Sequence, residues 1–552
     1  MKFQIPIFKG LNNAISPRLI PDEQAQFSKN CLLRNGNLSA LRANAGETTP
    51  ALATSPESLF LYQDTHWFSW GGDVTALNSP IAQDQYQRVY IIGDGAPKYT
   101  NSSIATGGGA LPFSDYLLGI PSPNQPIGDI TYYDQELDLV SPDVATDFPV
   151  DSNSGYINIT TDEDETRFYV CTLVSAYGEE GLPSVVSTVL EMLYSKDFVT
   201  LTFSDLGGFG NYNITKRRIY RTATSGEITE FFLVDEIPVT QATYVDNNVT
   251  SLLGAELNTT SYNSPPSNMA GGIITANGVL VGFAKNEIIP SEPYLPYAFP
   301  LEYRQSLPSN IVALAEMSGG IVIATDDKPA IMTGLTPNSY TLTILDAAYP
   351  CVSKRSMVDI GEAAIYASHD GLVAISQQGA SLASESTLSR EYWHTINPDS
   401  IHAYRYKDYY IGFCNGDMGF SFNLKDGTFT ELDFYASAGF FDTKTGKLYL
   451  LVDDLLVSFD NGSELSFTWQ SKEWQLPNAS LSTVKVRGNV LAGITLKVIA
   501  DDIQIMSKSL ENTIDTFRLP AIRAERLSVE LTGTGEVSTV TLGSSPQDLI
   551  DG

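Results

Sequence analysis

Side chains that could act as general bases or metal ligands are few in this sequence and are not grouped. Only four histidines occur in 552 residues, and none belongs to an H-E-x-x-H or H-x-H arrangement, which would place two imidazoles on one metal ion. His369 lies in a His-Asp-Gly triplet, which is better explained by a turn than by metal ligation. We therefore expect neither a metal site nor a histidine general base. The four histidines are His66, His369, His394 and His402.

The cysteines also give no sign of a site. They are scattered singly along the chain and show no C-x-x-C spacing, whereas a disulfide framework or a zinc site needs closely spaced pairs. The sequence predicts reduced and mostly buried thiols, which agrees with synthesis in a reducing cytoplasm. They are Cys31, Cys171, Cys351 and Cys414.

Acidic residues are so numerous that neighbouring carboxylates carry little information. With 64 of them, accidental pairs are certain, and a glycosidase needs two facing acids at a defined separation. The pairs Asp326-Asp327 and Asp453-Asp454 fall between short apolar runs, where turns are expected. The acidic run 162–165 lacks the fixed oxygen offsets of a calcium loop and is predicted to be the solvated start of a strand.

Motifs that cradle phosphates or activate a serine are missing too. The sequence contains no P-loop, no G-x-S-x-G elbow and no G-x-G-x-x-G after a strand, so glycines 107–109 are expected to form a flexible loop. The sequence therefore predicts no catalytic, cofactor-binding or metal residues, no cofactor and no enzymatic activity.

The elements that would position such residues are predicted to be strands. Hydrophobic residues make up 43% of the chain and charged ones 18%, a globular composition, and about three or four domains are expected from the length. No apolar run is long enough to span a bilayer, and the first ten residues lack the apolar core of a secretion signal. The 43 glycines and 29 prolines interrupt the chain too often for long helices.

Short β-branched or aromatic runs alternate with turns and form a loose repeat. Hairpins are predicted at 271–284, 319–334, 363–376, 406–423 and 447–460, across turns such as Asn-Gly and Asp-Asp. Units begin near Ile273, Ile311, Met357, His402 and Ala436, a spacing of roughly 35–45 residues that is typical of a four-stranded propeller blade. Stretch 59–100 has the same texture. We predict an all-β fold with an irregular β-propeller of about six blades; a pair of stacked sandwiches is the alternative.

The first part of the propeller is separated from the rest by a predicted insertion. It opens at the Pro-rich segment 119–126 and closes at 264–266, and its strands have the spacing of a fibronectin type III-like β-sandwich. We expect few contacts to cross its boundary. The predicted organisation is an N-terminal arm (1–50) docked through apolar side chains, propeller (51–120), inserted sandwich (121–266), remaining propeller (267–466) and a C-terminal β-sandwich (467–552).

Several phrases resemble one protein family. Segment 10–42 is similar to the opening of the tail nozzle or hub proteins of short-tailed phages (podoviruses), also called packaged-DNA stabilisation proteins, and matches that pattern at Ala25, Asn30, Leu33, Gly36, Leu38 and Arg42. Further matching phrases occur in the family's order over nearly the whole chain. They are 88–100, 174–184, 216–222, 351–376 and 467–477.

The resemblance implies a structural virion protein made in the host bacterial cytoplasm. It implies a propeller body with an inserted sandwich, assembled as a homo-hexameric ring below the portal adaptor, or head–tail connector. The ring would close the DNA channel, conduct the genome during ejection, and contact tail fibre, spike or needle proteins without stable membrane insertion. No site residues carry over, because the family has no fixed catalytic signature.

Net charge adds an expectation about the channel. At −31 per chain, six copies carry about −186 formal charges, so we expect a predominantly acidic lumen that duplex DNA passes without sequence-specific binding. The alternative is a receptor-binding or polysaccharide-cleaving tail spike or fibre. Such proteins are commonly trimeric with regular β-helical repeats or heptads, and this chain shows neither. A secreted adhesin is a more distant alternative.

Overall fold

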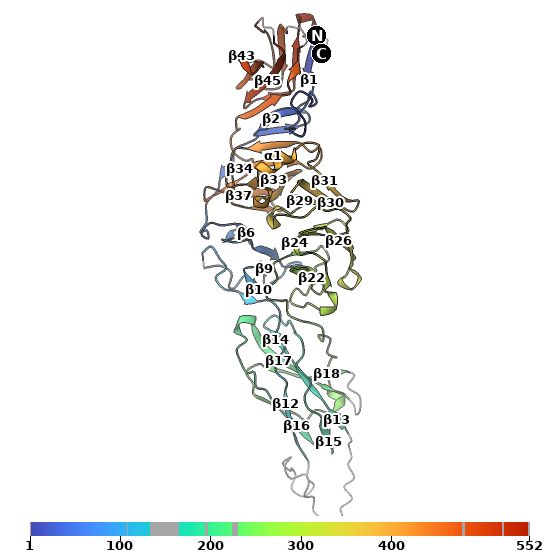
Figure 1. Ribbon diagram of the computed structural model, residues 1–552. Helices are drawn as coiled ribbons and strands as arrows, with labels where there is room; N and C mark the ends of the chain where they lie inside the picture. The colour runs from blue at the N-terminus through green and yellow to red at the C-terminus, as the bar shows by residue number, and fades with distance from the viewer. Residues whose placement is uncertain are drawn as a thin grey trace, which may run out of the picture.

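The computed structural model describes residues 2–107, 109–132, 165–193, 197–223, 230–476, 481–520 and 524–549. It is an elongated, almost entirely β structure with three modules in a row (Figure 1). A sandwich containing both termini lies at one end, the propeller lies in the middle, and the inserted sandwich lies at the other end. Within the described residues the single α-helix is α1 (Arg390–Thr395).

The middle module is an irregular β-propeller. Among the described residues, seven antiparallel units follow one another around it. Five are four-stranded sheets, one is the four-strand section β32–β35 of a larger sheet, and one is a two-stranded hairpin. First strands of neighbouring sheets contact one another from β8 through β20, β24, β28, β32 and β36 to β6, so these strands line the axis. The strands, sheet by sheet, are β6 (Ser58–Tyr62) and β7 (His66–Trp70); β8 (Thr75–Asn78), β9 (Val89–Gly93), β10 (Gly95–Thr100) and β11 (Tyr116–Leu117); β20 (Gly271–Ile274), β21 (Leu280–Ala284), β22 (Glu287–Pro290) and β23 (Gln305–Ser306); β24 (Ile311–Met317), β25 (Gly320–Thr325), β26 (Ala330–Thr333) and β27 (Thr341–Ile344); β28 (Val358–Asp359), β29 (Ala363–Ser368), β30 (Gly371–Ser376) and β31 (Gly379–Leu382); β32 (His402–Tyr406), β33 (Tyr409–Cys414), β34 (Met418–Asn423) and β35 (Phe429–Leu432); and β36 (Ala438–Asp442), β37 (Lys447–Val452) and β38 (Leu455–Ser458) with β5 (Ala45–Gly46).

The hairpins expected from the sequence are confirmed. All five form antiparallel strand pairs, and the five predicted unit starts coincide with, or lie within two residues of, the first strands of sheets. At Asp453 and Asp454, between β37 and β38, φ is +49° and +61°, the conformation of a type I′ turn, which Asp tolerates. Stretch 59–100, predicted as one unit, belongs to two sheets, the hairpin β6–β7 and the sheet β8–β11, so the ring has seven positions.

The N-terminal segment is not a separate arm but contributes strands to the propeller and to the terminal sandwich. Strand β5 pairs with β38 and so completes the last four-stranded sheet. Strand β2 (Ala25–Lys29) lies between β35 and β39 (Phe467–Ser471), so one sheet of ten strands runs from the propeller into the terminal sandwich. Of the apolar residues expected to dock, Ile5, Phe8 and Leu11 are buried, whereas Ile7 and Ile15 are exposed.

The terminal sandwich combines the two ends of the chain. Strands β45, β42 and β43 follow β39 in the ten-stranded sheet, and the facing sheet has the order β1-β47-β41-β44. Apolar side chains from both sheets and from the N-terminal strands form one core. The remaining strands are β1 (Lys2–Ile5), β3 (Cys31–Arg34), β4 (Asn37–Ala40), β40 (Trp474–Gln475), β41 (Thr483–Arg487), β42 (Ile494–Ala500), β43 (Ile503–Ser509), β44 (Ile514–Arg518), β45 (Arg526–Gly533), β46 (Glu536–Val537) and β47 (Thr539–Gly543).

The inserted module is a β-sandwich. In its described residues, sheet β12-β16-β19 faces sheet β14-β17-β18 across a shared apolar core, and β13 pairs with β15. The two connections to the propeller lie side by side, because a Cβ on Gly119 would sit 2.6 Å from Ser264. The strands are β12 (Ile127–Thr131), β13 (Glu165–Arg167), β14 (Tyr169–Ser175), β15 (Leu190–Met192), β16 (Phe198–Thr202), β17 (Ile214–Thr222), β18 (Phe231–Pro238) and β19 (Thr243–Asp246).

The pairing of the N-terminal segment (residues 2–46) with the propeller and the terminal sandwich, which we call the N-terminal splice, can be tested at Gly10. This position has no room for a side chain. A Cβ at this position would overlap the backbone of Phe429, while Leu11 N donates to Phe429 O at 2.8 Å. We expect Gly10→Ala to lower the free energy of unfolding by about 1–3 kcal/mol, the usual cost of overpacking, and to expose the N-terminal segment to protease. Thermal melting and limited proteolysis measure both effects.

Gly46→Ala is the matched control, because no atom lies within 4 Å of a Cβ there. Equal melting temperatures and equal cleavage rates of the two variants would contradict the claim that the packing of the N-terminal segment on Phe429 stabilises the fold.

Candidate functional site

The cysteines lie where thiol chemistry is suppressed. All four are free and buried. Burial raises the pKa of each thiol, to about 11 for Cys171 and to about 12 for Cys31, Cys351 and Cys414. A thiol with so high a pKa is protonated at neutral pH and is a poor nucleophile or metal ligand.

The structure does not bring the four histidines together. His369 and His394 are exposed, and the His66 ring packs edge-on against Phe68 at 5.1 Å. His402 is buried, and its Nε2 lies 2.7 Å from the carbonyl oxygen of Ala436. Within the described residues, no three His, Cys, Asp or Glu side chains are placed to hold a metal ion.

The acidic pairs lie at turns, as predicted. Asp326 accepts hydrogen bonds from the backbone and side chain of Asn310 at 3.0 and 2.8 Å, after β25. Glu165 is the only described residue of the acidic run 162–165 and is paired with Arg167 and Arg221. Burial acts to raise the pKa of Glu165, but the two guanidinium groups outweigh it and hold the pKa below its usual value. Gly107 and Gly109 have open space around them, and residue 108 lies outside the described residues.

Sequence reasoning overlooked the most connected polar group of the propeller, the axial cluster Ser353–Lys354–Arg355. Ser353 precedes the 3-10 turn η6 (Lys354–Ser356), and Lys354 and Arg355 are its first two residues. The turn lies just before β28, the first strand of its sheet. The turn is fixed because Ser356 Oγ donates to Ser353 O at 2.7 Å and accepts from Ala367 N at 2.9 Å. An adjacent Lys-Arg pair in a strongly acidic region was the available signal.

Each side chain of the axial cluster reaches a different part of the ring. Arg355 Nη2 donates to Ser437 O, just before β36, at 2.9 Å and also to Glu57 O, just before β6. Lys354 Nζ donates to Ala270 O, just before β20, at 2.8 Å.

Two further contacts extend the cluster to five sheets. Lys354 Nζ lies 3.2 Å from Asp73 Oδ2 near β8, and Ser353 Oγ donates to Ile401 O just before β32. All five contacts fall at the starts of first strands, so the cluster occupies the axis at one end of the propeller. Because its cations are bonded to groups of the chain itself, the cluster holds the five sheets together and is not a ligand site.

A second polar group fastens the inserted sandwich to the propeller. Arg88, which precedes β9, is bound by Asp84 at 2.8 Å and by Glu179 of the insert. Asn101 Nδ2 donates to Tyr177 OH at 2.5 Å, and the rings of Tyr86 and Tyr177 are 4.2 Å apart. The expectation of few contacts across this boundary is therefore wrong. An apolar cluster that contains side chains of both modules also spans it.

Inside the insert, buried arginines of β17 join its sheets. Arg221 is fully buried; its Nη1 lies 2.9 Å from Glu165 in β13, and its Nε lies 3.1 Å from Asp246 in β19. Arg217 is also fully buried; it pairs with Asp205 and lies 4.2 Å from the Phe203 ring centroid. Removing one partner of such a buried pair leaves an uncompensated charge, so the pairs fix the sheet-to-sheet geometry.

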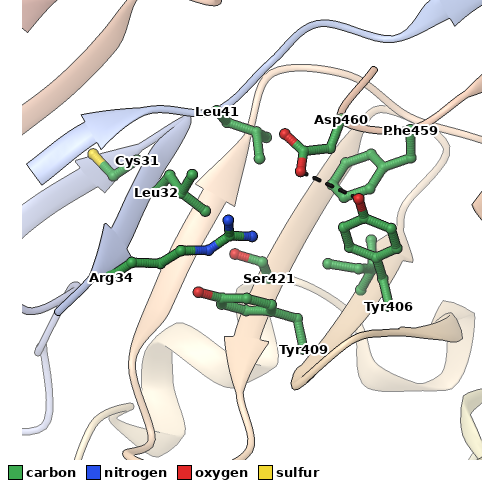
Figure 2. Close-up of a pocket in the computed structure, with 10 residues that line it drawn as sticks. Cys31, Leu32, Arg34, Leu41, Tyr406, Tyr409, Ser421, Phe459 and Asp460 are labelled. Atoms are coloured by element: carbon green, nitrogen blue, oxygen red, sulfur yellow. Dashed lines mark hydrogen bonds between the residues drawn. The ribbon is translucent and has the colours of Figure 1, made fainter. Parts of the chain in front are cut away.

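A small crevice lies between the N-terminal segment and the propeller (Figure 2). The side chain of Arg34 points into it from β3, and Tyr406 OH donates to Asp460 at 3.2 Å on the opposite side. Its volume is about 20 Å³, little more than one water molecule requires. The crevice is therefore a packing defect of the N-terminal splice rather than a ligand pocket.

Comparisons with known proteins do not identify a family. No family model and no curated protein matches the sequence. Solved structures with partial similarity include BamB from Moraxella catarrhalis (11% identity, TM-score 0.25, covering 52% of this chain and 80% of that one) and Hsv2 from Kluyveromyces marxianus (11%, 0.25, 52% and 88%). Scores this low carry no inference, and the fold description rests on the strand pairing. No helix among the described residues could cross a membrane.

A test of the axial cluster replaces Arg355, the residue that joins two sheets. We expect Arg355→Lys to lower the free energy of unfolding by about 1.5–3 kcal/mol, because a lysine cannot reproduce the two-pronged hydrogen bonding to Ser437 O and Glu57 O. Arg390→Lys is the control, since Arg390 is 65% exposed and pairs with Asp370 at the surface. Thermal melting at neutral pH measures the stability of both variants. An equal loss of stability would refute the claim that Arg355 holds propeller sheets together.

His402 gives a pH test of the same region. Burial, reinforced by nearby Arg355, lowers the pKa of His402 from 6.5 to about 3. A neutral native histidine contributes stability that is fully present above pH 6.5 and is lost as the pH falls toward 3. Between pH 7 and pH 5 the loss is about 2 kcal/mol.

We expect His402→Gln to lose less stability over this interval than the wild type, whereas His369→Gln, an exposed control, behaves like the wild type. Chemical denaturation at the two pH values measures the difference. An unchanged pH dependence in His402→Gln would contradict the prediction.

Proposed function

We propose that this chain is the tail nozzle subunit of a short-tailed phage, a structural protein that closes the DNA channel and conducts the genome during ejection. The observation that carries the proposal is the location of the phrases that resemble the nozzle family. Every one of them lies at a junction between modules or sheets. The resemblance therefore concerns how the modules are held together and not the lining of a pocket.

The individual junctions support this point. Phrase 10–42 contains β2, and the described residues 467–476 of the phrase 467–477 contain its antiparallel partner β39. Trp469 Nε1 also donates to the carbonyl oxygen of Lys9, just before the first phrase, at 2.8 Å. Phrases 88–100 and 174–184 contain the partners Arg88 and Glu179. Phrase 216–222 supplies the buried arginines of β17, and phrase 351–376 includes the axial cluster.

The closed axis bears on where DNA would pass. Because one turn bonds to five sheets at the propeller axis, duplex DNA cannot run through a single subunit. A conduit built from this chain would lie between copies, which a closed cyclic ring provides. We propose a hexamer below the portal adaptor, with fibre, spike or needle proteins as further partners and with acidic surface facing the channel.

The rival proposal, a spike that binds or cleaves polysaccharide, predicts a different particle. Class averages of the purified full-length protein from negative-stain electron microscopy test the two directly, with native mass spectrometry for the copy number. We expect a sixfold ring with an axial passage and no release of reducing sugar from host glycans. An elongated trimer without a passage, or sugar release abolished by one Asp or Glu substitution, would overturn the proposal.

A further inference from the structure

Charge is segregated along this molecule. Residues 51–466, which form the propeller and the insert, contain 19 Lys and Arg against 51 Asp and Glu. Residues 1–50 and 467–552, which form the terminal sandwich and its splice, contain 14 against 13. The net charge of −31 therefore belongs to the body, and the end that carries both termini is close to neutral.

One face of the terminal sandwich concentrates cations. Residues paired directly across antiparallel strands point to the same side of a sheet. In sheet β1-β47-β41-β44 the pairing aligns Thr483 with Arg518, and Lys485 with Thr516. The same face continues through Arg487 on β41 and through Thr541 and Thr539 on β47, and ends with Lys2 and Gln4 on β1.

Carboxylates are excluded from this face of the four strands. Asp515 of β44 pairs with Val486, whose side chain is buried in the core, so Asp515 belongs to the opposite face. Nearby, Asp548 in the turn η8 (Pro546–Leu549) is bound by Ser544 N and Ser545 N at 2.9 and 3.0 Å. Arg518 is exposed and has no ion pair among the described residues.

A groove lies on the basic face beside β41, β44 and η8. It has a volume of about 580 Å³, within the usual size range of ligand pockets. Lys485, Arg518 and Thr516 provide donors on the sheet side, and Pro546 and Leu549 provide apolar walls. Phe517 pairs with the core residue Val484, so its ring packs on the opposite face. Beside it on the same face, Arg487 Nε is buried without a hydrogen-bond partner in the described part of the chain.

We propose that this groove binds an acidic segment of a partner protein. Carboxylates of the segment pair with Lys485 and Arg518 and accept a hydrogen bond from the Thr516 hydroxyl, while an apolar side chain packs against Pro546 and Leu549. The apolar walls favour a peptide over DNA, because a phosphate backbone has no apolar group to place there. The surface would exist on a single subunit, so the proposal goes beyond the nozzle function and does not depend on ring formation.

Fluorescence anisotropy with the full-length protein and short labelled probes tests the proposal. The probes are an Asp/Glu peptide containing leucines, the same peptide with Asn and Gln in place of the acids, and a short DNA duplex. We expect the acidic peptide to bind most tightly, with an affinity that falls as salt is raised. Tighter binding of the duplex, or equal binding of the neutral peptide, would overturn the proposal.

Charge reversal locates the binding site. We expect Lys485→Glu/Arg518→Glu to weaken peptide binding by roughly tenfold or more, because both close charge pairs become repulsive. Arg518→Glu alone keeps the bond from Lys485 Nζ to Leu549 O at 2.9 Å and serves as a second variant if the double variant misfolds. Lys425→Glu is the control, since Lys425 is 73% exposed and pairs with Asp408 on the propeller.

Sedimentation of the same variants separates the partner from a second copy of the chain. An unchanged oligomeric state together with lost peptide binding supports the proposal. A changed oligomeric state would mean that the face joins two copies and would overturn it. Ring formation that fails in the wild type, with peptide binding intact, would refute the nozzle function and leave the groove proposal standing.

Discussion

Backbone hydrogen bonding by the first 46 residues holds the propeller and the terminal sandwich in one structure. Strand β2 pairs in parallel with β35 of the propeller and antiparallel with β39 of the terminal sandwich, so the two modules share a sheet. Strand β5 then fills the open edge of the last four-stranded sheet. An unpaired sheet edge in either place would expose its donors and acceptors and invite association with another chain. The N-terminal segment thus closes the ring and fixes its orientation to the sandwich.

Where no strand crosses a junction, buried ion pairs hold the two sides together. Arg88 with Asp84 and Glu179 fastens the insert to the propeller, and Arg221 with Glu165 and Asp246 fastens the sheets of the insert to one another. Such pairs add little stability in comparison with an apolar core, but breaking one is costly, and this penalty favours a single relative orientation.

The axial cluster shows how the ring itself avoids an open centre. Lys354 and Arg355 satisfy carbonyl groups at the starts of several first strands, where the curvature of a propeller leaves backbone groups that need partners. The guanidinium group of Arg355 and the ammonium group of Lys354 therefore donate their hydrogen bonds within the chain. A second group of cations lies on one face of the terminal sandwich, at the end of the molecule that carries both termini (Figure 1).

Most strands and turns could be predicted from the sequence, because these depend on local patterns. Alternating apolar runs and turn residues such as Asp453-Asp454 specified the five hairpins and the starts of five of the seven propeller units. Isolated cysteines and turn-bound acids were likewise assigned correctly from their spacing. The tertiary structure alone decided which distant segments meet, since sheet edges are completed by whichever strand can reach them. Nothing local to Ala45–Gly46 indicates a partner at Val457, and nothing local to Lys354-Arg355 indicates five sheets around it. The basic face required the register of four strands, in which Lys2 pairs with Gly543 from the other end of the chain, and only long-range pairing provides it.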